Sequence, residues 1–191
     1  MDTPILVDFV RGAHLLCVVL GMGPALYFDI RALSKIGQPI TIHDQEELRR
    51  IHRVVTLACL GLWITGCTLI WQQTHFDAAA FSAKLWLKLL VVSALTANAA
   101  ALHFWVLPVF MRSTGRRVIE LALATLMPMT MTISAGLSLA CWGLALALGA
   151  SALLKTAAWS VLLPVAGAWV IACIAGTVSM TLVGRNRLRA T

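Results

Sequence analysis

Residues 84–111 read KLWLKLLVVSALTANAAALHFWVLPVFM, an apolar run in which only Lys88 and His103 are ionisable after the first residue. As an α-helix this run is about 40 Å long, which exceeds the roughly 30 Å hydrocarbon core of a bilayer. It is also too long and too continuous for a buried β-strand. The run therefore predicts a membrane-spanning helix.

Four further apolar runs of comparable length predict four more spans. They cover residues 3–33, 50–72, 118–150 and 156–183. Of the 191 residues, 60% are hydrophobic and only 12% are charged, whereas about a quarter of an ordinary soluble domain is charged. This composition excludes a soluble globule and a disordered chain. We therefore expect an all-α integral membrane protein in which residues 1–191 form a single domain of five transmembrane helices.

The basic residues predict how the chain is oriented in the membrane. Eleven of them flank the first and third connections and the C-terminal end, and four lie on the opposite side, namely Arg11, Lys84, Lys88 and Lys155. Basic residues concentrate on the cytoplasmic side, so we expect the N-terminus outside and the C-terminus in the cytoplasm of a bacterial inner membrane. The short connections predict an up-down four-helix bundle with the fifth helix against its side. Topology accounts for the basic charge, so nucleic acid is not an expected partner.

Tryptophan and polar residues add detail to this arrangement. Trp71, Trp86, Trp142 and Trp159 lie near the outer helix ends and are expected in an interfacial aromatic belt. Strongly polar side chains within a span normally face the bundle interior and have a partner, because burying them in lipid is unfavourable. The histidines within the spans are therefore the main functional candidates.

His14 lies in the outer half of the first predicted helix. Asp8, Arg11 and His14 share one helix face through their spacing of three. A neutral imidazole can bind iron or copper, and Arg11, one turn nearer the surface, could pair with an outward-pointing haem propionate. The alternative is a histidine that hydrogen-bonds a neighbouring helix, with Arg11 extending to the interface.

Two more histidines are candidates on the inner side. His103 follows small residues that let a helix or a flat ligand approach closely, and His52 lies at the inner end of the second span. One arrangement has two histidines on one tilted haem. Another has an outer site at His14 and an inner site at His103 and His52, with arginines nearby for carboxylates. Both histidines are equally compatible with hydrogen bonds between helices.

Other side chains extend these alternatives. Lys88 is either an interfacial lysine or a cation that binds a propionate or a substrate carboxylate. Met127 and Met131 share one face of the fourth helix. Their thioethers could bind copper or iron, or they could pack around the kink at Pro128.

The combination of His14 in the first helix, Arg31 at its inner end and Trp86-Leu87-Lys88 at the start of the third helix resembles a known family. It is similar to the membrane protein superfamily that contains the HemJ-type protoporphyrinogen oxidase and the CopD-type copper-resistance proteins. The resemblance covers roughly residues 1–110 and implies bound haem b, with His14 and Lys88 as the functional pair. The fifth helix, His52 and His103 depart from the family pattern.

These observations predict a haem b-binding inner-membrane protein that acts in electron transfer or as a membrane oxidoreductase. Its candidate cofactor residues are His14, His103, His52, Arg11 and Lys88. The alternatives are a copper-handling protein that uses His14, Met127 and Met131, and a structural subunit of a larger membrane complex. Beyond the lipid bilayer, the expected partners are a redox protein or a porphyrin-like or quinone-like substrate, and a homo-oligomer is compatible with the sequence.

Overall fold

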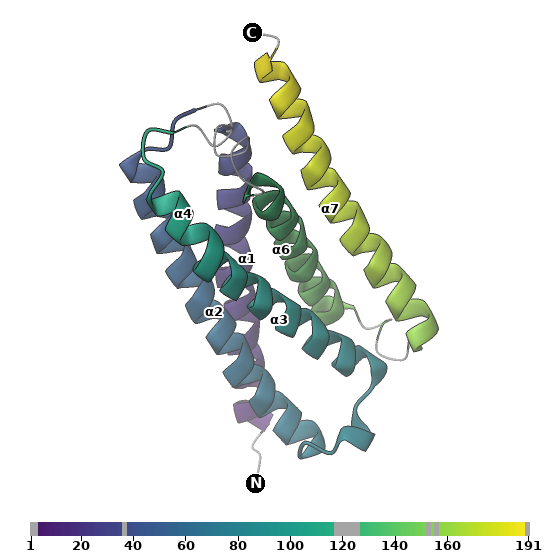
Figure 1. Cartoon of the computed structure of the whole chain (residues 1–191). Coiled ribbons are helices and arrows are strands. Elements are labelled where there is room, and N and C mark those ends of the chain that lie inside the picture. Colours follow the sequence, from purple (N-terminus) through teal and green to yellow (C-terminus); the bar gives the residue numbers. More distant parts are fainter. Residues whose placement is uncertain (1–3, 36–37, 117–126, 152–153, 155–156, 190–191) are drawn as a thin grey trace.

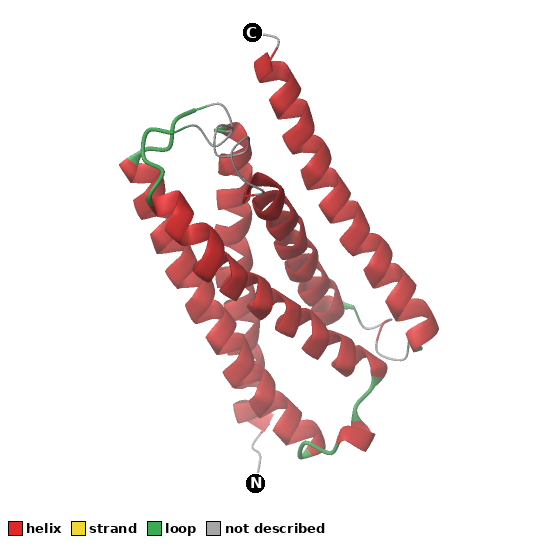
Figure 2. Ribbon diagram, in the orientation of Figure 1, coloured by secondary structure: helices red, strands yellow, loops and turns green. Residues whose placement is uncertain are grey.

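The computed structural model of the chain describes residues 4–35, 38–116, 127–151, 154 and 157–189, and within these residues it has helices and no β-strand. Figures 1 and 2 show successive long helices running in opposite directions, so that α1 begins and α7 ends at opposite ends of the molecule. The long helices are α1 (Pro4–Ser34), α2 (Ile42–Thr74), α3 (Ala83–Ala101), α6 (Met127–Ala150) and α7 (Trp159–Arg189). The shorter elements are the 3₁₀-helix Ala78–Ala80, the π-helix Leu102–Val106 and α4 (Leu107–Met111).

The prediction of five membrane-spanning helices is confirmed for length and composition. The helical segments that could cross a bilayer are Pro4–Ala32, Ile42–Thr74, Ala83–Met111, Met129–Ala150 and Trp159–Val183. Residues 118–126 of the predicted fourth span lie outside the described residues. The predicted start of the fifth span, at residue 156, also lies outside them. The fifth helix continues six residues past its predicted end, from residue 183 to Arg189.

The predicted start of the second helix, at residue 50, is wrong, because α2 begins at Ile42. Thr41 adopts an extended conformation and its hydroxyl accepts a hydrogen bond from the Asp44 backbone N–H at 3.2 Å. The Asp44 carboxylate in turn accepts from the Thr41 N–H at 3.0 Å. This reciprocal capping box pairs backbone N–H groups that would otherwise lack partners at the helix start. The acidic residues Asp44, Glu46 and Glu47 therefore belong to a helix rather than to a loop.

The same acidic residues join the end of α1 to the start of α2. The Arg31 guanidinium lies 2.7 Å from the Glu47 carboxylate and 3.5 Å from that of Asp44. Lys35 also pairs with Asp44, and the Tyr27 hydroxyl donates to Glu47 at 3.1 Å. These contacts form a polar clamp, defined here as Tyr27, Arg31, Lys35, Asp44 and Glu47, that holds the two helices together at one end.

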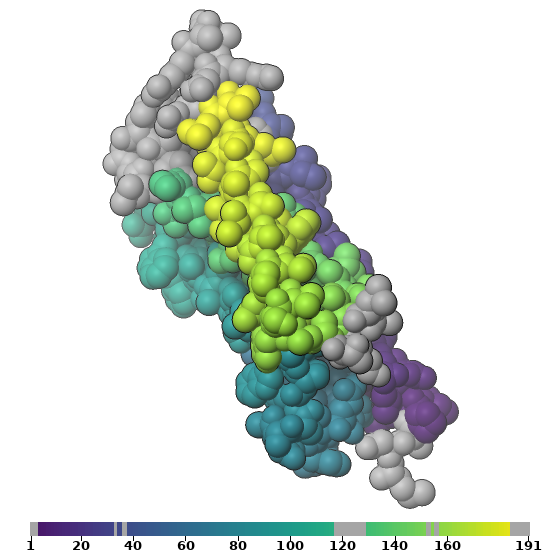
Figure 3. Space-filling model, turned by 90° about the vertical axis from the view of Figure 1, so that its right-hand side faces the viewer, coloured from purple at the N-terminus to yellow at the C-terminus, as the bar shows by residue number. Residues whose placement is uncertain are grey.

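The hydrophobic core is shared by all five long helices. Helix α1 packs chiefly against α2, whereas α3 and α7 both pack chiefly against α6. A buried polar contact joins α3 to α6, because Ser134 donates to the Asn98 side-chain oxygen at 2.7 Å and the Asn98 amide donates to the Ser134 carbonyl at 3.0 Å. In Figure 3, α7 forms a ridge along one face of the molecule. These contacts place α6 at the centre of one half of the structure.

Trp142 does not lie in an interfacial belt, in contrast to its prediction. Its side chain is only 1% exposed, whereas Trp71, Trp86 and Trp159 are more than 40% exposed. The indole fills the space left by Gly21 on α1, where an added Cβ would lie 2.6 Å from the Trp142 Cζ2 atom. The small residue on α1 therefore admits a large ring from α6, and the belt prediction fails at this position.

The third span changes its winding near His103. Helix α3 ends at Ala101 and passes into the π-helix Leu102–Val106, where the Leu107 N–H bonds the Leu102 carbonyl five residues back. Pro108 follows directly. Proline lacks an N–H and its ring clashes with the carbonyl four residues earlier, so a wider turn before Pro108 relieves that clash. The π-helix thus places His103 in a locally irregular part of the helix, a feature that is frequent at functional sites.

Candidate functional site

His14 lies half-buried between α1 and α2. Its Nδ1 atom is 2.7 Å from the Thr65 Oγ1 atom on α2. The Thr65 hydroxyl is also 2.6 Å from the Gly61 carbonyl oxygen. A carbonyl only accepts hydrogen bonds, so both contacts are hydrogen bonds when the hydroxyl proton goes to Gly61 and Thr65 accepts from His14 Nδ1–H. In that arrangement the Nε2 atom of neutral His14 carries a lone pair.

The surroundings of that nitrogen are small on one side and cationic on another. A Cβ added to Gly66 of α2 would meet only His14 Cε1, at 3.6 Å. The half-buried Lys88 on α3 is close enough to act electrostatically on His14. Among the described residues, no acidic side chain forms an ion pair with Lys88. An imidazole lone pair beside a cation that lacks an acidic partner suits a ligand that combines a metal ion with a carboxylate.

Arg11 does not complete this group. It is exposed, and its guanidinium pairs with Asp8 at 3.3 Å one turn away on the same helix. Exposed pairs of this kind contribute little to stability, so Arg11 remains free to exchange partners at the surface.

His52 and His103 are brought together by α2 and the π-helix. The Nε2 atom of His52 lies 2.9 Å from the Nδ1 atom of His103. The ring planes are nearly parallel, at 16°, with centroids 5.0 Å apart. Two axial ligands on one iron need their nitrogens about 4 Å apart, since each metal–nitrogen bond is about 2.0–2.1 Å. The pair is therefore hydrogen-bonded rather than spaced for axial ligation.

The two histidine sites lie far from each other. Thr65, which binds His14, is thirteen residues from His52 along α2, which corresponds to about 20 Å. A single haem cannot be ligated by His14 and His103 at that separation. The structure therefore separates His14 from the His52–His103 pair, and whether either place binds a cofactor stays a prediction.

Met131 does not lie near His14. Met131 packs against Ile40 and Phe110 and lines a small cavity with Arg31. Arg31 is seventeen residues from His14 along α1, or about 25 Å. The Met127 side chain lies outside the described part of the structure. A copper site formed by His14 and Met131 is therefore not assembled.

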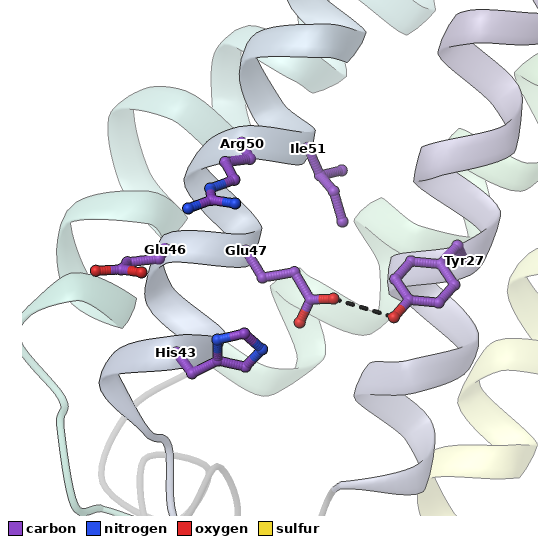
Figure 4. A pocket seen from close by; sticks show the side chains of 6 residues that line it. All are labelled: Tyr27, His43, Glu46, Glu47, Arg50 and Ile51. Carbon is purple, nitrogen blue, oxygen red and sulfur yellow. Dashed lines mark hydrogen bonds between the residues drawn. The ribbon is translucent and has the colours of Figure 1, made fainter.

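A larger open pocket lies next to the polar clamp and contains none of the predicted cofactor residues. It has a volume of about 310 Å³ and lies between α1 and the first turns of α2. In Figure 4, Tyr27 of α1 faces Glu47 of α2, whereas Arg50 extends from α2 on the side of Glu46. The lining residues are Tyr27, His43, Glu46, Glu47, Arg50 and Ile51. Two carboxylates and one guanidinium line the pocket, so both signs of charge are present there.

Sequence reasoning missed Thr65 and Gly66, the two α2 residues that surround His14. Within the described ranges, no group of three or more His, Cys, Asp or Glu side chains is close enough to hold a metal ion. Any metal chemistry at His14 thus depends on one protein ligand and on groups that the cofactor brings. No protein-family model, curated protein or solved structure matches the chain.

Proposed function

We propose that the chain is a multi-pass protein of a bacterial inner membrane that binds haem b at His14 and acts in electron transfer or as a membrane oxidoreductase related to the HemJ-type and CopD-type proteins. The single observation that carries the proposal is the contact between His14 Nδ1 and the Thr65 hydroxyl, which favours the tautomer with the proton on Nδ1. Metal-binding histidines usually donate their other ring N–H to an oxygen, which orients the ring. Thr65 provides that oxygen, and Nε2 is left to bind iron.

The residues around His14 fit the rest of a haem. Gly66 has no side chain, so the only atom near its Cα direction is His14 Cε1, 3.6 Å from where a Cβ would lie, and Lys88 can pair with a propionate. When bound, haem supplies one-electron chemistry. The chain's own groups then set the environment of that chemistry: Thr65 fixes the ring orientation and Lys88 places positive charge near the ligand.

The spectrum of the purified protein tests the cofactor. Protein isolated in detergent from haem-replete cells is expected to show a Soret band and sharp bands after reduction with dithionite. A colourless protein that contains copper would favour the copper alternative, and a protein with neither chromophore nor metal would leave a structural subunit.

Replacing Thr65 tests the orienting hydrogen bond. The Thr65→Val variant keeps the shape of the side chain but removes the acceptor for His14 Nδ1–H, so haem affinity is expected to fall about 10–100-fold. The Thr65→Ser variant retains the hydroxyl and is expected to bind haem nearly as well as the wild-type protein. Haem titration of both apoproteins measures this difference. Equal affinities for the two variants would contradict the role assigned to Thr65.

The orientation belongs to the same proposal. We infer an external N-terminus and a cytoplasmic C-terminus, with α1, α2, α3 and α6 as the up-down bundle and α7 at its side. The support is the excess of basic residues on one side of the spans. A C-terminal green fluorescent protein fusion is expected to fluoresce, and an alkaline phosphatase fusion at the same position is expected to be inactive. An active phosphatase fusion would contradict the inferred cytoplasmic C-terminus.

A further inference from the structure

The His52–His103 contact is an edge-to-edge hydrogen bond between two imidazoles. The 5.0 Å between ring centroids exceeds the 2.9 Å between nitrogens by about two ring radii, and the planes differ by only 16°. The two rings therefore lie nearly in one plane and share one proton between Nε2 of His52 and Nδ1 of His103.

This sharing couples the two ring nitrogens that take no part in the hydrogen bond, His52 Nδ1 and His103 Nε2. If His52 Nε2 donates, His52 Nδ1 has the lone pair and His103 Nε2 carries a proton. If His103 Nδ1 donates, the lone pair is on His103 Nε2 and the proton is on His52 Nδ1. A proton that arrives at His103 Nε2 can therefore shift the shared proton to His52 Nε2 and release another proton from His52 Nδ1.

The Nε2 atom of His103 belongs to a side chain that lipid can reach. His103 is exposed and lies within the span Ala83–Met111, eight residues from its end, or about 12 Å. His103 Nε2 forms no hydrogen bond with any residue that the structure describes. An unsatisfied polar group in hydrocarbon is unfavourable, so a ligand that arrives through the lipid and offers a hydrogen-bonding oxygen would stabilise it.

A flat ring next to His103 narrows the class of ligand. Phe104 is 70% exposed, and its ring stands edge-on to His103 at 86° with the centroids 5.0 Å apart. An aromatic face of this kind favours an offset or edge-to-face contact with another ring. The ligand should therefore be lipid-soluble and carry a planar ring with oxygens that can both accept and donate.

We propose that His103, supported by His52 and Phe104, binds the headgroup of a lipid-soluble quinone or hydroquinone, and that the two imidazoles carry its proton. The site rests on the redox function proposed above and names its substrate class. A hydroquinone O–H donates its proton to His103 Nε2, the shared proton moves from His103 Nδ1 to His52 Nε2, and His52 Nδ1 releases a proton to interfacial water. One electron leaves the hydroquinone for each proton, to a one-electron acceptor such as a haem. Complete oxidation to the quinone takes two such steps, and between them both imidazoles return to the starting tautomers by ring rotation, which restores the lone pair on His103 Nε2 and the proton on His52 Nδ1.

Nitrogen NMR of histidine-labelled protein in lipid nanodiscs tests the site without any redox activity. Without added ligand, a coupling across the His52–His103 hydrogen bond is expected. Duroquinone is expected to convert His103 Nε2 saturably to its protonated form, and duroquinol to its acceptor form. Nanodiscs of the same lipid without quinone show whether lipid carbonyls alone occupy the site. Absence of a response at His103 to both compounds would overturn the proposal.

Variants separate this site from the haem site. His103→Gln is expected to lose the saturable response, and His52→Gln is expected to lose the coupled change at the second ring. The exposed His43 provides the control, because His43→Gln should respond like the wild-type protein. The His14→Ala variant should also respond normally, so failure of the haem proposal and failure of this one give different results.

A kinetic measurement examines proton transfer directly. In the haem-loaded protein, reduction by duroquinol is expected to slow at least about tenfold in His103→Gln and His52→Gln, since positioned proton acceptors commonly contribute 10²–10⁴-fold. Reduction by dithionite should remain unchanged in both variants. Equal duroquinol rates in the wild-type protein and both variants would exclude proton transfer through the pair.

Discussion

The His14→Ala protein is expected to fold and insert normally but to lose its Soret band. The substitution removes the nitrogen that the Thr65 contact leaves free, while the other contacts between α1 and α2 persist. A direct ligand contributes more than the group that orients it, so haem affinity is expected to fall by more than about 100-fold. Haem titration and the reduced spectrum of the purified variant measure the loss, and added imidazole is expected to restore part of the absorption.

His103→Ala is the matched variant for this experiment, because it removes an imidazole from the His52–His103 pair and leaves His14 in place. Its spectrum is expected to resemble that of the wild-type protein. The reverse pattern, with haem retained in His14→Ala and lost in His103→Ala, would place the cofactor at the inner pair. Full haem content in both variants would show that neither histidine is required.

A second large effect is expected from Gly21→Ala. The new methyl group would overlap the Trp142 indole, with its Cβ 2.6 Å from Cζ2. The indole is almost completely buried and therefore has little room to move. Overpacking of this kind typically lowers the free energy of unfolding by about 1–3 kcal/mol. Unfolding by SDS in dodecyl maltoside micelles, followed by tryptophan fluorescence, measures the change.

Gly12→Ala and Gly23→Ala are internal controls on the same helix. An added Cβ would meet no atom within 4 Å at either position. Alanine favours a helix over glycine by roughly 0.5–1 kcal/mol, so both controls are expected to be neutral or slightly stabilising. If Gly21→Ala unfolds at the same SDS fraction as the controls, the close contact between α1 and α6 does not stabilise the protein.

The five spans could be predicted because length and apolar composition alone decide them. The start of α2 does not follow from the same criterion, since residues 42–49 are mostly polar. Their helical state comes from the Thr41–Asp44 capping box and from the ion pairs with α1. The signal in the sequence for this start is the capping pattern at Thr41 rather than hydrophobicity.

That error also explains why Thr65 was missed. In an antiparallel pair of helices, the connection between them determines which residues face each other. Starting the second helix eight residues too late moves the expected partner of His14 by about two helical turns. With α2 beginning at Ile42, residues 61–66 lie opposite His14. Among them, Thr65 carries a hydroxyl group, and that hydroxyl contacts the His14 ring.

The pairing of His52 with His103 was open to prediction only as one of two arrangements. Both histidines are predicted on the inner side of the membrane, but the contact depends on how the helix winds before Pro108. A local change from α to π winding rotates every side chain that follows it. Periodicity with a fixed 3.6-residue turn cannot represent such a change.

The polar clamp has a mechanical consequence for the α1–α2 hairpin. Its ion pairs lie at the end near Ser34 and Ile42, whereas His14 lies toward the opposite end of α1. The clamp therefore sets the separation of α1 and α2 at its own end only. Beside His14, that separation depends instead on side-chain packing and on the Thr65 contact, so the haem proposed there would alter the hairpin where no ion pair holds it.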